Sequence, residues 1–157
     1  RELIWLSNPK PMRFAGLLAH LRHYAQETLG ESGLSLRLDT EDPPDVEVTG
    51  ELRQHTLFAI KEILQNCVRH AQASQVTFTG RTQLPFYRIE IADNGLGFDQ
   101  ERISRTDDPS GRFGSRTGFI SLRNRLHRVG GRIVIHGSSG PEGGAAVLLW
   151  IPVVGEA

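Results

Sequence analysis

Residues 51–71 restrict the fold more than any other segment, because their polar and apolar side chains separate onto opposite faces of a helix. When successive residues are placed about 100° apart, the apolar side chains fall within an arc of roughly 140°. The members of this arc are Leu57, Ile60, Ile63, Leu64, Cys67, Val68 and Ala71. The segment therefore predicts a helix that faces the core with this arc and begins near Thr49 or Gly50.

The opposite arc of the same helix gathers polar side chains, namely His55, Glu62, Gln65, Asn66, Arg69 and His70. Glu62, Asn66 and His70 are spaced four residues apart and form one row along the helix. Position alone favours a solvated helix face. The residue types, however, favour a metal site. A carboxylate beside an amide carbonyl offers the hard oxygen ligands that Mg²⁺ prefers, with phosphate and water completing its shell. A functional row predicts a nucleotide phosphate near Asn66.

The other segments alternate between helical and β patterns. Helices are predicted at 11–29, ended by Gly30, and at 119–129, ended by Gly130 and Gly131. Strands are predicted at 35–38, 75–79, 86–92, 132–136 and 145–153, with an extended edge at 46–48. The strands at 75–79 and 86–92 should form a hairpin, and residues 99–117, which lack apolar periodicity, a long mobile loop. We therefore expect an α/β fold with a mixed sheet and the helices on one face.

The strand at 86–92 ends in the sequence DNGLGF at 93–98. Asn94-Gly95 is typical of a hairpin turn, but the residues that follow lack the alternation of a returning strand. A calcium loop would need acids at alternate positions, and a Walker A loop would need GxxxxGK[ST]; neither pattern occurs here. What remains is a carboxylate, Asp93, held at a strand end beside glycines that let the backbone approach a ligand. A second glycine cluster, Gly114 and Gly118, leads into the helix at 119–129, whose N-terminus would favour a phosphate.

Composition excludes several classes of function. Eighteen Lys and Arg residues balance eighteen Asp and Glu residues, so no global field favours nucleic acid or an anionic membrane as the main partner. The single cysteine, Cys67, excludes a disulfide framework and a CxxC zinc site, and it is interpreted as a packed small hydrophobe in a cytoplasmic protein. The start at Arg1, without an initiator Met, indicates a piece of a longer chain.

Three motifs in order resemble the N, G1 and G2 boxes of the histidine-kinase-type ATPase superfamily, which also contains DNA gyrase, the heat-shock chaperone ATPase and the mismatch-repair ATPase. They are EILQNCVRHA at 62–71, DNGLGF at 93–98 and GFISLRNR at 118–125. The Arg-x-Arg at 123–125 and GGRI at 130–133 are most similar to sensor kinases of the nitrate/nitrite-sensor branch. The resemblance implies a two-layer α/β sandwich, the Bergerat-type ATP-binding fold. Residues 1–10 resemble the end of a dimerisation helix or a linker, and 11–157 the catalytic and ATP-binding domain.

The resemblance also implies that ATP and Mg²⁺ are bound under a lid at about 99–117. Asn66 would ligate Mg²⁺, Glu62 would polarise the attacking group or orient the metal's water, and Asp93 would accept from the adenine amino group. The other implied nucleotide contacts are Arg69, His70, Gly95, Gly97, Gly118 and Phe119. The family usually has Leu at the position of Phe119, Gly at that of Ser121 and Thr at that of Ala145, and these departures imply a tighter phosphate loop and weaker adenine binding.

The family's phosphoacceptor is a histidine on a separate helical domain, followed in this branch by an acidic residue. No histidine of this chain has that neighbour; they are His20, His23, His55, His70, His127 and His136. The implied partners are therefore a dimerisation domain of the same protein, outside this chain, and a response regulator. The implied assembly is a homodimer, with membrane anchoring left open. Two alternatives stay open: a nucleotide-binding signalling module with weak or no catalysis, and an ATP hydrolase or serine kinase of the same superfamily.

Overall fold

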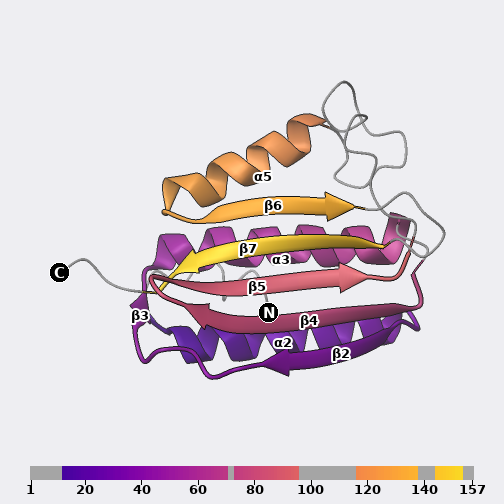
Figure 1. Ribbon diagram of the computed structural model, residues 1–157, viewed down its shortest axis with the longest axis horizontal. Helices are drawn as coiled ribbons and strands as arrows, with labels where there is room; N and C mark the ends of the chain where they lie inside the picture. The colour runs from indigo at the N-terminus through magenta and orange to yellow at the C-terminus, as the bar shows by residue number, and fades with distance from the viewer. Residues whose placement is uncertain (1–11, 71–72, 96–115, 138–143, 154–157) are drawn as a thin grey trace.

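The computed structural model describes residues 12–70, 73–95, 116–137 and 144–153 (Figure 1). The helices are α2 (Phe14–Glu31), α3 (Gly50–His70) and α5 (Arg116–Arg128). The strands are β1 (Met12–Arg13), β2 (Ser35–Thr40), β3 (Glu47–Val48), β4 (Gln75–Gln83), β5 (Phe86–Asp93), β6 (Arg132–Gly137) and β7 (Ala145–Pro152). Each predicted helix and strand is therefore present within these ranges, with ends shifted by a few residues.

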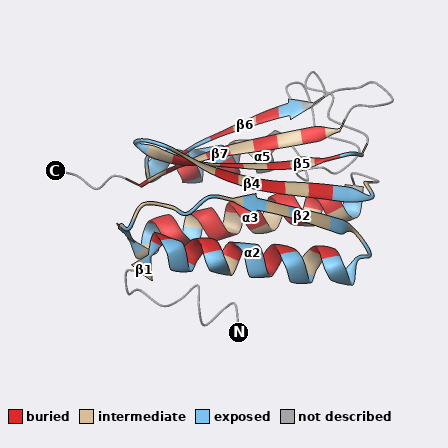
Figure 2. Cartoon of the chain, turned by 60° about the horizontal axis from the view of Figure 1, so that its bottom comes forward, coloured by how far each residue is buried: buried red, intermediate tan, exposed pale blue. Residues whose placement is uncertain are grey.

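The main sheet has five strands in the order β2-β4-β5-β7-β6. Strands β2 and β4 are parallel, and the other neighbours are antiparallel, so the predicted mixed sheet is confirmed. The expected hairpin between β4 and β5 is also confirmed. Helices α2, α3 and α5 lie along the same side of the sheet, which gives the expected two layers (Figures 1 and 2). A separate two-stranded pairing of β1 with β3 accounts for the predicted extended edge at 46–48.

The core lies between the helices and one face of the sheet. Buried and partly buried residues alternate strictly along β5 and β7, so every second side chain of these strands faces the helices. The apolar arc predicted for α3 meets them, since Leu57, Ile60, Ile63, Leu64 and Cys67 are all buried. Figure 2 shows the red, buried side of α2 and α3 turned toward the strands. The helix that most restricted the sequence interpretation is thus the centre of the helical layer.

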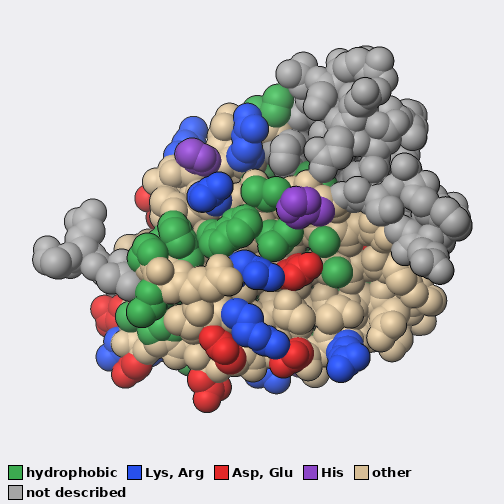
Figure 3. Space-filling model, in the orientation of Figure 1, with side chains coloured by type: hydrophobic (Ala, Val, Ile, Leu, Met, Phe, Trp, Pro, Cys, Tyr) green, Lys and Arg blue, Asp and Glu red, His purple; other side chains and the backbone are tan. Residues whose placement is uncertain are grey.

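The other face of the sheet is half-buried and carries its own contacts (Figure 3). The guanidinium of Arg132 on β6 lies 5.4 Å from the ring centroid of Trp150 on β7. An ion pair joins Arg81 on β4 to Asp39 on β2, and another joins Arg88 to Glu90 within β5. Within the described ranges, no helix is long and apolar enough to span a membrane.

The helix ends show which glycines terminate helices. Helix α2 runs past Gly30, which was predicted to end it, to Glu31; Gly33 has a φ of 76°, and the N–H of Leu34 donates to the carbonyl of Leu29. A glycine is favoured at such a position because side chains rarely adopt a positive φ. Gly130, with a φ of 82°, ends α5 in the same way, as predicted.

The start of α3 is capped as the sequence predicts. The Thr49 hydroxyl accepts a hydrogen bond of 3.1 Å from the N–H of Leu52, which satisfies one of the free donors at the helix N-terminus. Helix α5 starts three residues earlier than predicted, at Arg116 rather than 119. The predicted loop at 99–117 was therefore too long at its C-terminal end, because Arg116 and Thr117 belong to the helix; its other residues, 99–115, lie outside the described part of the chain.

Candidate functional site

Asp93 is the last residue of β5, and its side chain is 9% exposed. Its Oδ1 accepts a hydrogen bond of 2.9 Å from the N–H of Gly95, and the thiol of Cys67 on α3 lies 3.8 Å from its Oδ2. The carboxylate is thus buried at the point where the sheet meets α3, with polar contacts to both oxygens. A buried carboxylate is stable only with such contacts. Asp93 stands where the sequence predicted a carboxylate fixed at a strand end.

Asn66 lies on α3 next to Cys67 and is more buried than a solvated helix face allows, at 4% exposure. Its Nδ2 is buried and has no hydrogen-bond partner among the described residues. Buried amide groups in folded proteins are almost always paired, and an exception needs an explanation. An amide held at a helix face for a bound ligand would give this pattern. This burial weighs against the solvated-face alternative for Asn66.

Backbone packing at the end of β7 holds the Asp93 turn in place. A Cβ built on Gly144 would lie 1.7 Å from the carbonyl oxygen of Asp93 and 3.1 Å from the Cα of Asn94. Only glycine fits this approach. Asn94 is anchored separately, because its Oδ1 accepts hydrogen bonds from the N–H groups of Ser74 and Gln75 at 2.9 and 3.0 Å. This role of Gly144 was not predicted from the sequence, because no local pattern reports a contact between residues 51 positions apart.

Glu62 occupies the groove between α3 and α5. It is half-buried and lines a cavity of about 380 Å³ together with Gln54, His55, Phe58, Lys61 and Arg125. The Arg125 guanidinium lies 4.2 Å from the centroid of the Phe58 ring, so the floor of this cavity is formed by a cation–π contact. Glu62 and Asn66 are thus on the same helix but in different surroundings, one open and one buried.

His55 lies further along the same groove, which widens to about 550 Å³ beside Ser121 and Asn124 of α5. Burial lowers the pKa of His55; the Glu51 carboxylate opposes this shift, and the positive charges of Arg125 and Arg128 add to it. The imidazole is therefore favoured in its neutral form in the folded protein. His55 thus shares the polar arc of α3 but lines the groove toward α5.

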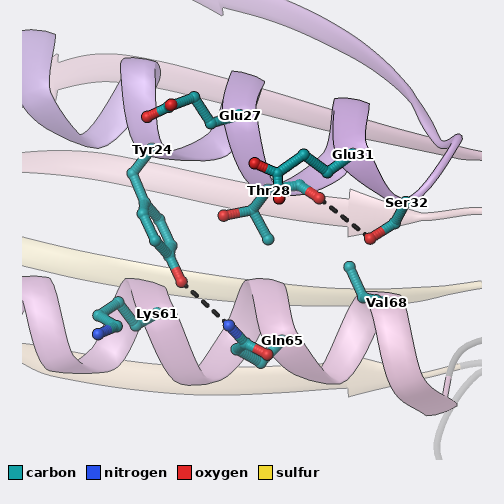
Figure 4. A pocket seen from close by; sticks show the side chains of 8 residues that line it. All are labelled: Tyr24, Glu27, Thr28, Glu31, Ser32, Lys61, Gln65 and Val68. Carbon is teal, nitrogen blue, oxygen red and sulfur yellow. Dashed lines mark hydrogen bonds between the residues drawn. The ribbon is translucent and has the colours of Figure 1, made fainter.

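The side chain of Gln65, which was predicted to share the polar arc with Glu62 and Asn66, turns instead toward α2. Its Nε2 donates to the hydroxyl of Tyr24 on α2 at 3.2 Å, and it lines a cavity of about 440 Å³ between α2 and α3. Figure 4 shows Tyr24 and Gln65 pointing toward each other across this gap, with Lys61 one turn away. Because Gln65 lies at the edge of the arc, packing against α2 decided its direction.

The remaining predicted nucleotide contacts are placed only in part. Arg69 is exposed near the end of α3, and His70 is the last residue of that helix, with a side chain outside the described part of the chain. Gly118 and Phe119 lie in the first turn of α5, one helical turn whose N–H groups lack intrahelical partners; the side chain of Phe119 is likewise outside the described part. Gly97 is outside the described residues.

The described residues contain no group of three or more His, Cys, Asp or Glu side chains that could hold a metal ion. The donor set around Asn66 was predicted to suit Mg²⁺, an ion that usually takes one or two protein oxygens and completes its shell with phosphate and water. Only the Oδ1 of Asn66 could be a ligand of such an ion, whereas the unpartnered Nδ2 is a donor and suits a phosphate oxygen.

Comparison with known proteins identifies the family of this chain. The profile of the family described as "Histidine kinase-, DNA gyrase B-, and HSP90-like ATPase" matches residues 53–155. The histidine-protein kinase/phosphatase DegS of Brevibacillus brevis is 32% identical over 97 residues, which is 62% of this chain and 22% of that protein. The nitrate/nitrite sensor protein NarQ of Escherichia coli is 27% identical over 135 residues, 85% of this chain and 22% of that protein. The chain thus spans only about a fifth of the length of these relatives.

Solved structures share the fold at low identity. The mycobacterial sensor histidine kinase MprB aligns with a TM-score of 0.67 at 16% identity, covering 93% of this chain and 98% of that one. Full-length ShkA in complex with AMPPNP aligns with a TM-score of 0.68 at 18% identity, covering 96% of this chain and 32% of that one. With a family profile covering most of the sequence, three ordered motifs and the expected sandwich, the chain belongs to the family of histidine kinase-, DNA gyrase B- and HSP90-like ATPases.

Proposed function

We propose that this chain is the catalytic and ATP-binding domain of a two-component sensor histidine kinase, which binds Mg²⁺-ATP and transfers the γ-phosphate to a histidine on a separate dimerisation domain. The observation that carries the proposal is the buried, unpartnered Nδ2 of Asn66, the residue before Cys67 on α3, whose thiol contacts the buried carboxylate of Asp93. Unmet polar groups at a buried position are expected where a ligand supplies the missing partner.

The proposed roles follow from these positions. Asp93 accepts a hydrogen bond from the adenine amino group, and Gly95 and Gly97 let the backbone approach the base. Asn66 provides a ligand to Mg²⁺, whose charge would neutralise the phosphates. Glu62, one turn before Asn66 on α3, polarises the attacking imidazole or orients a water of the metal. Arg69, His70, Gly118 and Phe119 contact the ribose or the phosphates, with the first turn of α5 supplying N–H donors.

The proposal includes partners outside the chain. Phosphoryl transfer needs an acceptor histidine from the dimerisation domain of the same protein, and the phosphate then passes to a response regulator. Residues 1–10 would connect to that dimerisation domain, and 11–157 would form the catalytic domain. We place this domain in the cytoplasm, within a homodimeric sensor whose membrane anchoring is left open. The named relatives, which are sensor kinases several times longer than this chain, support this arrangement.

Calorimetric titration with AMPPNP and Mg²⁺ tests the binding step. We expect saturable binding that Asp93→Asn weakens at least tenfold, because the amide cannot accept in the same way as the carboxylate. Asp39→Asn is the matched control, since it removes a carboxylate from an exposed ion pair on β2, and it should leave binding unchanged. Absence of binding at millimolar nucleotide, or equal loss in both variants, would contradict the proposal.

A second function, a nucleotide-binding module with weak catalysis, is favoured by one observation. Asp93 pairs in register with Ala145, which offers only a methyl group where a hydroxyl could share in holding the base. Transfer from ATP to the acceptor histidine in the full-length sensor distinguishes the two functions. Radiolabel appearing on the acceptor, and lost in Glu62→Gln, supports the kinase; nucleotide binding without label supports the module.

A further inference from the structure

The hydrogen bonding of Asp93 involves a residue whose role the motif comparison leaves open. The sequence interpretation of Cys67 as a packed small hydrophobe is correct for its burial, since it is 4% exposed. It is incomplete for its chemistry, because the Sγ points at the Oδ2 of Asp93 from 3.8 Å. A thiol is a weak donor, but a buried carboxylate is a strong acceptor, and hydrogen bonds to charged groups are the stronger ones.

The two oxygens of Asp93 are held from opposite directions along the chain. Oδ1 accepts from the backbone N–H of Gly95, two residues later, and Oδ2 receives the thiol from α3, 26 residues earlier. The first contact belongs to the turn itself. The second joins the end of the sheet to the helix that also carries Asn66. Rotation of the carboxylate would break both contacts, so together they fix its plane.

The strand on the other side of Asp93 cannot supply the same contact. Asp93 lies opposite Ala145 in the pairing of β5 with β7, and the Ala145 side chain, 4% exposed, ends in a methyl group. Gly144, the residue before it, approaches the Asp93 backbone too closely to carry any side chain. The side-chain donor to Oδ2 therefore comes from the helix.

We propose that Cys67 is a positioning residue for adenine recognition: its thiol orients Asp93 so that the carboxylate accepts from the exocyclic amino group of the base. This inference rests on the proposed function. It predicts that Cys67 controls the preference for an adenine nucleotide over a purine nucleotide that lacks the amino group, and not nucleotide binding in general.

The test compares two nucleotides across a small set of variants. ATP and purine riboside triphosphate, which differ only in the exocyclic amino group, are titrated calorimetrically with Mg²⁺ into the wild-type chain, Cys67→Ala and Cys67→Ser. We expect Cys67→Ala to weaken ATP binding about fivefold and to change binding of the analogue less than twofold, in line with one modest hydrogen bond. Cys67→Ser, which keeps a donor, should retain the wild-type preference within twofold.

Ile63→Val is the matched control, since it also removes one heavy atom from the buried side of α3, one turn away. A packing role would lower the affinity for both nucleotides together. Ile63→Val should therefore change both affinities equally and only slightly, and equal losses of both affinities in Cys67→Ala would overturn the inference. Cys67→Val serves as a second donor-free variant if Cys67→Ala does not fold, as judged by circular dichroism. Wild-type chain that binds neither nucleotide refutes the proposed function, whereas wild-type binding with an unchanged preference in both donor-free variants refutes only the role of Cys67.

Discussion

The two ends of strand β5 both bury a polar side chain against the helices, and they treat it differently. At the start of the strand, Tyr87 is fully buried, its hydroxyl donates to the Glu41 carbonyl at 2.7 Å, and its ring packs edge-on against Phe14 at 5.2 Å. At the other end, Asp93 is held by a backbone N–H and by the thiol of Cys67, and Asn66, the residue before Cys67 on α3, has an unpartnered Nδ2. One end is closed and completes the core. The other end leaves the Nδ2 of Asn66 available to hydrogen-bond a ligand.

This difference teaches where stability and function lie in a two-layer sandwich. Gly80 on β4 leaves the space that the Tyr87 ring fills, because a Cβ there would lie 2.3 Å from the Tyr87 hydroxyl. The closed end is thus complementary in shape and in hydrogen bonding. Proteins depart from full satisfaction of buried polar groups mainly at functional sites. Substitutions at the two ends should therefore separate stability from nucleotide binding.

The largest expected effect is a loss of folding stability from substitutions at the Tyr87 end of β5. Tyr87→Ala removes a buried aromatic ring and should lower the free energy of unfolding by about 4 kcal/mol, as measured by urea denaturation. Tyr87→Phe keeps the ring and should lower it by only about 1 kcal/mol, through the lost hydrogen bond. The folded fraction of either variant should bind nucleotide with unchanged affinity. A stable Tyr87→Ala variant with impaired nucleotide binding would contradict the assignment of stability to the Tyr87 end and of binding to the Asp93 end.

For Gly144→Ala we expect a smaller loss of folding stability, accompanied by a loss of nucleotide affinity. The new Cβ would collide with the Asp93 carbonyl, so the end of β7 or the turn after β5 must shift. We expect unfolding free energy to fall by about 3 kcal/mol, within the range of overpacked sites, and nucleotide affinity to fall as well because Asp93 moves. Gly30→Ala is the control, since nothing lies within 4 Å of a Cβ built there. Retention of wild-type affinity in Gly144→Ala would show that the approach does not position Asp93.

The closed end should also respond to alkaline pH. Burial raises the pKa of Tyr87 from its ordinary value of 10.0 to about 12. Since the folded state binds this proton more tightly than the unfolded state, the contribution to stability is complete below pH 10 and is lost as the pH rises toward 12. The shift corresponds to about 3 kcal/mol. This loss exceeds the ~1 kcal/mol by which wild type is more stable than Tyr87→Phe, so between pH 9 and 11.5 the unfolding free energy of wild type should fall to that of the variant and then below it. A constant difference would contradict this.

The smallest effect on stability, and of opposite sign, is expected at the ligand end. Asn66→Ala removes an amide whose Nδ2 is buried without a partner, so the free energy of unfolding without nucleotide should stay the same or rise by up to about 1 kcal/mol. Mg²⁺-dependent nucleotide affinity should fall at least tenfold at the same time. If Asn66→Ala lowers stability by more than 1 kcal/mol, the amide is structural.

Much of this comparison was accessible from periodicity. The apolar arc of α3 predicted its buried side, and the alternation in 86–92 predicted both the strand and the position of Asp93 at its end. Each of these signals repeats within a short segment, so no tertiary information is needed to detect it. The family resemblance added roles for residues that the pattern had only grouped, such as Glu62 and Asn66.

What the sequence could not predict depends on contacts between distant segments. Gly30 and Gly33 are equally plausible helix ends by composition, and the hydrogen bond from Leu34 to Leu29 decided between them. Gln65 turned toward Tyr24, 41 residues away, and Cys67 reached Asp93 across 26 residues. The close approach of Gly144 to Asp93 is likewise a product of strand register. Such choices are made by packing, which a helical projection does not contain.

The most direct test of the account is a nuclear magnetic resonance titration of the chain with Mg²⁺-AMPPNP, following backbone amides at both ends of β5. The account predicts large shift changes at Asn66, Cys67, Asp93 and Gly95, with unchanged resonances at Gly80 and Tyr87. Changes confined to the Tyr87 end, or none at either end with saturating nucleotide, would contradict the claim that the nucleotide binds at the Asp93 end of β5.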